Sequence, residues 1–169
     1  GHTLSISKTV SFFERLGQES ADTFRRMMVI DALTFNRDRH AGNFGVLFDN
    51  DTLEPVKMAP VFDMNMCMLA GFMEQDLEKP WSRIRQFSPS FAGVNDFISL
   101  GMAFLNSWIR KDLISTGRLT VDIRPDKVMT RDMLSRLEKI LNLQRDAILS
   151  GKYSDESEVF VPGVSIDKL

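Results

Sequence analysis

Cysteine, histidine and long apolar runs are scarce in this sequence, and each absence narrows the class of protein. Cys67 is the single cysteine among 169 residues, which excludes an internal disulfide and a zinc site built from cysteines. No apolar run approaches the ~20 residues that a membrane-spanning helix needs. The formal net charge is −2 and acids are interspersed with bases, which gives no general argument for nucleic-acid binding. We therefore expect a protein of the reducing cytoplasm that binds neither membranes nor, by itself, nucleic acid.

The residues that are present are typical of a globular protein. Hydrophobic residues make up 43% of the chain and charged residues 26%, and this length is sufficient for one domain with a substantial core. Only two histidines occur. His2 stands at the start and is assigned no role, so His40 is the histidine with a candidate function.

Helical spacing of apolar residues dominates the sequence. Gly17 and Gly151 follow two of the apolar stretches and predict where those helices end. Ser20 or Asp22 is expected to cap the second helix at its beginning. The helices are predicted over residues 8–16, from Ser20 or Asp22 to Phe35, over 94–114, and over 132–150.

A β-hairpin is predicted over residues 44–58. Two short strand-like stretches, 44–48 and 54–58, flank the turn-rich sequence Asp49-Asn50-Asp51-Thr52. The predicted fold class is therefore mostly α with a small β-hairpin. We expect residues 1–151 to form one domain and residues 152–169 to form a polar, poorly ordered tail.

The most informative stretch is the polar loop that precedes this hairpin. Asp38 and Asn43 stand five positions apart in it, and Asp63 follows twenty residues after Asn43. The hairpin would return the chain to its starting point and bring Asp63 close to Asn43. An aspartate beside an acceptor hydroxyl, with an asparagine and a second aspartate on magnesium, is the arrangement that phosphoryl transfer from ATP requires. The order of these residues therefore predicts a site of the protein-kinase type.

Other residues of the loop have supporting roles in this hypothesis. His40 is a candidate catalytic residue that is expected to hydrogen-bond the loop or a phosphate. Arg37 or Arg39 is expected to compensate phosphate charge, with Arg37 as the candidate ATP-binding residue. Gly42 is expected to allow a backbone turn. Asp31, in the preceding helix, is expected to pack beneath the loop as a hydrogen-bond acceptor. A turn-forming or capping role for Asp and Asn is the alternative reading of each residue alone.

The sequence Asn36-Arg37-Asp38-Arg39-His40-Ala41-Gly42-Asn43-Phe44-Gly45, followed by Ala59-Pro60-Val61-Phe62-Asp63, resembles the C-terminal kinase domain of HipA-like proteins. Those are bacterial serine/threonine kinases of toxin–antitoxin modules and their relatives. The family has a tyrosine where this chain has Phe62. The Asp-Arg-His-x-x-Asn core is also similar to the phosphatidylinositol kinases, but the Ala-Pro element before Asp63 favours the HipA-like family.

The resemblance implies the C-terminal lobe of a protein-kinase-like fold. By it, Asp38 is catalytic, and Asn43 and Asp63 bind magnesium and, with it, ATP. It also implies a serine- or threonine-containing protein substrate and an antitoxin-like partner. A kinase needs a glycine-rich phosphate-covering loop, yet no Gly-x-Gly-x-x-Gly occurs in the sequence. We therefore expect the chain to be inactive or nearly so without an N-terminal lobe, supplied by the same or another chain.

Two alternatives stay open from the sequence. One is a kinase-like module without catalytic activity that binds a protein through its helical surface. The other is a lipid or small-molecule kinase, because Lys79, Arg83 and Arg85 flank Trp81 and Ile84 and would suit a membrane-facing segment.

Overall fold

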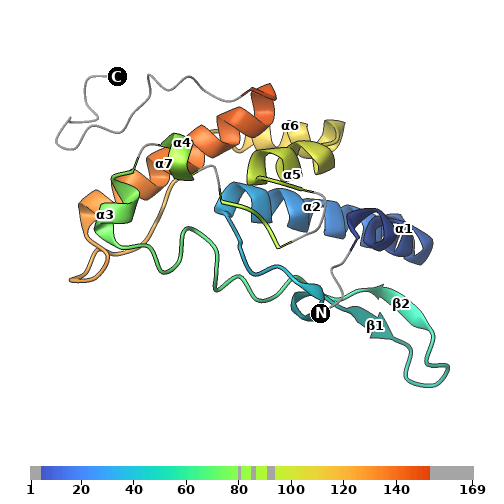
Figure 1. Ribbon diagram of the computed structural model, residues 1–169. Coiled ribbons are helices and arrows are strands. Elements are labelled where there is room, and N and C mark those ends of the chain that lie inside the picture. The colour runs from blue at the N-terminus through green and yellow to red at the C-terminus, as the bar shows by residue number, and fades with distance from the viewer. Residues whose placement is uncertain (1–4, 80, 85–86, 91–93, 153–169) are drawn as a thin grey trace.

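The architecture is mostly helical with one two-stranded antiparallel sheet, which confirms the predicted mixture of helices and a hairpin (Figure 1). A computed structural model describes residues 5–79, 81–84, 87–90 and 94–152 of the chain. In these ranges no helix is both long enough and apolar enough to cross a membrane.

The first two helices meet at Gly17. Helix α1 spans Ile6–Leu16 and helix α2 spans Gln18–Thr34, and Gly17 between them has a φ of 116°. The predicted end of the first helix is confirmed. The predicted cap of the second is wrong, because α2 begins immediately after Gly17, whose positive φ turns the chain without help from a side chain. Ser20 is instead buried within α2.

The hairpin is confirmed, with shorter strands than predicted. Strand β1 spans Val46–Phe48 and pairs antiparallel with β2, Pro55–Met58. The backbone N–H of Ala59 continues the pairing by donating to the carbonyl of Gly45 at 2.9 Å. The backbone N–H of Met58 donates to the Ser20 hydroxyl at 3.1 Å. This last bond fastens the hairpin to α2 and gives the buried Ser20 its partner.

The chain after the hairpin is irregular and then helical again. Two single-turn helices, α3 (Glu74–Leu77) and α4 (Trp81–Ile84), precede helix α5 (Phe97–Phe104) and helix α6 (Ser107–Ser115). The continuous helix predicted over 94–114 is wrong.

The break between α5 and α6 has a local cause. The side chain of Asn106 accepts a hydrogen bond from the backbone N–H of Ile109 at 2.9 Å and so begins α6 as an N-cap. Apolar residues continue across the break, which is why hydrophobic pattern alone predicts one helix.

The last helix, α7, spans Arg131–Ser150 and ends at Gly151 in the left-handed conformation, with a φ of 68°. Its predicted extent and stop residue are confirmed to within one residue. Most of the predicted polar tail, residues 153–169, lies outside the described residues.

Helix α2 is the centre of the molecule. In Figure 1 helices α5 and α7 lie on one side of α2, and the hairpin and the preceding 3-10 turn η1 (Ala41–Asn43) lie on the other. One hydrophobic cluster joins these layers. Its members from α2, α5 and α7 include Phe24, Met27, Met28, Phe97, Leu100, Leu137 and Ile148.

Gly101 allows the close approach of α5 and α7. A Cβ atom at this position would lie 2.7 Å from Cδ1 of Ile148. Such a distance is well inside van der Waals contact, so a side chain at position 101 would require the buried Ile148 or its helix to shift.

The substitution Gly101→Ala should therefore destabilise the protein by about 1–3 kcal/mol, the usual cost of overpacking a core. Urea unfolding followed by circular dichroism measures this. Helix propensity alone predicts the opposite sign, a gain of about 1 kcal/mol from replacing a helical glycine. Adding Ile148→Val removes Cδ1. The double variant should then lose less unfolding free energy than the sum of the losses in the two single variants. A Gly101→Ala protein at least as stable as the wild type would contradict the close packing.

Candidate active site

A fully buried ion pair lies beneath the predicted loop. Arg39 and Asp31 each expose only 1% of their side chains. Arg39 Nε donates to Asp31 Oδ2 at 2.7 Å, and Nη2 donates to Oδ1 at 3.0 Å. Asn36 Nδ2 adds a third bond to Oδ1 of the same carboxylate at 2.8 Å. The expectation that Asp31 accepts hydrogen bonds beneath the loop is confirmed.

The same arginine ties together two segments that are far apart in sequence. Arg39 Nη1 donates to the backbone carbonyls of Asn43 at 2.5 Å and of Phe62 at 2.8 Å. The two carbonyl oxygens can therefore be no farther apart than the sum of these distances. Arg39 Nη2 also contacts Met64 Sδ at 2.9 Å. Asn43 and Asp63, the residue after Phe62, are held near each other, as the hairpin predicts.

Arg39 itself has a different position from the one expected. The sequence suggests Arg37 or Arg39 as a cation for phosphate. Arg39 is wrong for that role because its guanidinium is buried and bonded to Asp31 and to two carbonyls. No helical spacing identifies this pairing, because Arg39 lies in the loop beyond the end of α2 at Thr34.

Hydrogen bonds between asparagine side chains and the backbone give the loop its shape. The Asp38 backbone N–H donates to Asn36 Oδ1 at 3.2 Å. Asn43 is 5% exposed, and its Nδ2 donates to the carbonyl of Asp38 at 2.6 Å. This bond spans the loop and leaves Oδ1 as the side-chain oxygen of Asn43 that remains for a ligand.

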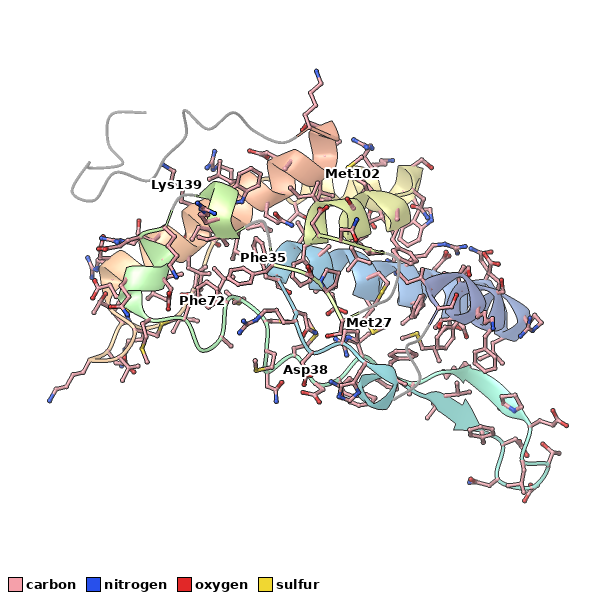
Figure 2. The ribbon with its side chains drawn as sticks, in the orientation of Figure 1. Met27, Phe35, Asp38, Phe72, Met102 and Lys139 are labelled. Atoms are coloured by element: carbon pink, nitrogen blue, oxygen red, sulfur yellow. The ribbon has the colours of Figure 1, made fainter. Side chains whose placement is uncertain are left out.

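The side chain of Asp38 projects from this loop and is 51% exposed. Figure 2 shows Asp38 on the side of α2 that is opposite to α5. In the described part of the chain the imidazole of His40 is the one ionisable group recorded beside it, with Nε2 4.0 Å from Oδ1. That distance is longer than a hydrogen bond, so the carboxylate is available to a hydroxyl group from outside.

His40 has the structural hydrogen bond expected of it. Its Nδ1 accepts from the backbone N–H of Gly42 at 3.0 Å and caps the short η1 turn. A Cβ on Gly42 would lie 2.9 Å from His40 Cε1. A side chain at position 42 would therefore require the His40 ring to shift, and the φ of Gly42 is not the positive value that a glycine-only turn needs.

Asp63 has a φ of 57°, in the left-handed region that few residues other than glycine adopt. Its side chain is partly buried, and none of the described residues donates a hydrogen bond to its carboxylate. Aspartate adopts this conformation more readily than most residues, and the free carboxylate is available to a ligand.

Arg37 lies in a different environment from the phosphate site predicted for it. Nη2 donates to the carbonyl of Ala70 at 3.0 Å. The guanidinium carbon lies 5.4 Å from the ring centre of Phe72 and 5.6 Å from that of Phe87. A role in binding ATP stays a prediction for Arg37, and its present contacts are structural.

Three further residues have environments that limit their possible roles. Burial raises the pKa of the Cys67 thiol, and Thr34 Oγ1 donates to its sulfur at 3.2 Å. The raised pKa favours the protonated thiol, which is less reactive than the thiolate.

Trp81 is 5% exposed and Ile84 is 0% exposed, so these apolar residues are not available to insert into a membrane, as the lipid-kinase alternative would need.

The buried pair should make the largest single contribution to the stability of the site. Replacing Asp31 by Asn leaves the Arg39 charge uncompensated, so unfolding free energy should fall by about 3–5 kcal/mol. Denaturant unfolding is the measurement. The matched control is Glu14→Gln, which breaks the exposed 2.6 Å pair with Arg25 and should cost about 0–1 kcal/mol. Equal losses in the two variants would contradict the account of Arg39 as a buried anchor.

Comparisons of the chain with protein-family models, with curated proteins and with solved structures found no match. The resemblance to HipA-like kinases therefore rests on the loop and the Asp63 segment alone. The contacts of Arg39 with the carbonyls of Asn43 and Phe62 bring the loop and the Asp63 segment together.

Proposed function

We propose that this chain is the C-terminal lobe of a HipA-like serine/threonine protein kinase that uses ATP and magnesium. The observation that carries the proposal is the double contact of Arg39 Nη1 with the carbonyls of Asn43 and Phe62. It holds the loop with Asp38 and Asn43 against the segment with Asp63. These are the three residues that the resemblance identifies as functional.

The oxygen atoms available at the site suit magnesium bound together with a nucleotide. Asn43 retains Oδ1 and Asp63 retains its carboxylate, while the ion's other ligands would be phosphate oxygens and water. Among the described residues no group of three His, Cys, Asp or Glu side chains could hold a metal alone. The cation would therefore bind as part of a Mg-ATP complex, whose phosphate charge it compensates.

Asp38 would orient the acceptor hydroxyl of a protein substrate and receive its proton. Half of its side chain is open to solvent, which allows a substrate to reach it. His40, with Nδ1 bonded to Gly42, would present Nε2 toward Asp38 and hold the loop in shape.

An apolar groove of about 290 Å³ provides one wall for a nucleobase. It is lined by Phe12 and Phe13 of α1 and by Phe44, Gly45 and Val46, which directly follow Asn43. Flat aromatic ligands favour such surfaces. The opposite wall and the phosphate-covering loop would come from the N-terminal lobe, and an antitoxin-like protein would be a further partner.

One observation favours the alternative of a protein-binding module. The hairpin exposes apolar side chains, with Phe48 58% and Leu53 74% exposed. Exposed apolar residues at a hairpin tip are a common feature of protein contacts. A scaffold of this kind would not need a nucleotide, so nucleotide binding separates the two functions.

Calorimetric titration of the full-length protein with Mg-ATP tests the proposal. Asp63→Asn should weaken binding at least about tenfold, because it removes the one carboxylate ligand. Asp38→Asn, the matched control, should bind Mg-ATP as the wild type does and lower phosphotransfer by about 10²–10⁴-fold.

If the wild type, Asp63→Asn and Asp38→Asn all bind Mg-ATP with the same affinity, Asp63 is not a metal ligand. Absence of Mg-ATP binding by the wild-type protein would favour the scaffold. Unchanged phosphotransfer by Asp38→Asn would overturn the role of Asp38.

A further inference from the structure

Arg37, the residue immediately before Asp38, is clamped by two later segments of the chain. Its guanidinium is bonded to the Ala70 carbonyl and lies against the rings of both Phe72 and Phe87. Those two rings pack edge to face, with centroids 5.0 Å apart. Figure 2 labels Phe72 on the chain between the hairpin and α3. Movement of either segment would therefore change the contacts of Arg37 and the position of the loop next to Asp38.

A serine hydroxyl makes a second contact with Arg37. Ser90 Oγ donates a hydrogen bond to the backbone carbonyl of Arg37, across 53 residues of sequence. Ser90 is exposed while the preceding Pro89 is buried. The buried proline anchors the segment, and the exposed hydroxyl stays accessible to a modifying enzyme.

A phosphoryl group on this oxygen would reverse the contact. The hydroxyl is the donor and the Arg37 carbonyl is the acceptor. After phosphorylation Oγ has no proton, and the ester carries a charge of about −1.5 to −2 at neutral pH. Oxygen would then face oxygen, so the bond must break and the segment must move away from the loop.

We propose that Ser90 is a phosphorylation site and that its modification releases the loop that contains Asp38. The γ-phosphoryl group of a nucleoside triphosphate is transferred to Ser90 Oγ. The bond from phosphorus to the bridging oxygen breaks and leaves a nucleoside diphosphate, the new bond joins phosphorus to Oγ, and the hydroxyl proton passes to a base. An effect of this release on phosphotransfer by Asp38 would rest on the proposed function. The release of the loop itself does not rest on it.

Ser88 is the internal control for this inference. It is also exposed and lies two residues away, but its Oγ donates to the carbonyl of Asn95 at 2.9 Å. A charge at Ser88 should therefore leave the Arg37 carbonyl, and the loop, unchanged.

Hydrogen exchange read by mass spectrometry tests the release. Phosphoserine is incorporated at position 90 or at position 88 during synthesis, and exchange is followed in the peptide that spans residues 36–43. The loss of one hydrogen bond predicts exchange about fivefold to tenfold faster with phosphoserine at 90, and no change with phosphoserine at 88. Ser90→Ala should accelerate exchange to a smaller extent. No acceleration at 90, or the same acceleration at 88, would overturn the inference.

The origin of the phosphate is decided by mass spectrometry of the protein from its native cells. Phosphate on Ser90 in the wild type that disappears in Asp38→Asn indicates that the protein modifies itself. Phosphate that persists in Asp38→Asn indicates another kinase. Both results support the site, and a protein without phosphate on Ser90 under every growth condition tested would overturn it. Loop release without any phosphotransfer by the protein would refute the proposed function alone.

Discussion

The buried pair of Arg39 and Asp31 is the interaction on which the site depends. It fixes a charged guanidinium under the loop, where its remaining donors bond to the carbonyls of Asn43 and Phe62. A buried charge is expensive unless each of its donors has a partner. The cost is offset here by a two-point ion pair and by backbone acceptors from two segments. Any rearrangement of either segment would remove an acceptor, which restricts both to one position.

This constraint explains how a small hairpin can form part of a site. A two-stranded sheet is marginally stable by itself, and β1 and β2 are short. Its base is held to α2 by the bond between Met58 and Ser20, and its two ends are held by Arg39. The tip remains exposed and apolar. The site is therefore supported from beneath by α2, while Arg37 connects the loop laterally to the chain around Ala70 and Ser90.

Much of this organisation could be predicted from sequence because it is local. The stop at Gly151, the hairpin and the return of Asp63 toward Asn43 follow from periodicity and turn chemistry. Three features could not. An arginine in a polar loop gives no local sign that it will be buried, and a helix break within an apolar run depends on the cap at Asn106. The contact between Ser90 and Arg37 is a tertiary pairing that no periodicity encodes. The nucleotide and metal roles of Asn43 and Asp63 remain predictions.

The most direct test of the central claim is NMR of the full-length protein with Mn²⁺ and ATP. Manganese replaces magnesium at such sites and broadens the signals of nearby nuclei. We expect broadening of the Asn43 side-chain amide and of the Asp63 backbone amide, with the Asn142 side chain in α7 unaffected. At equal, subsaturating Mn-ATP, the Asn43 amide should broaden less in Asp63→Asn than in the wild type. Sharp Asn43 and Asp63 signals at saturating Mn-ATP would contradict the claim that the two residues share one cation.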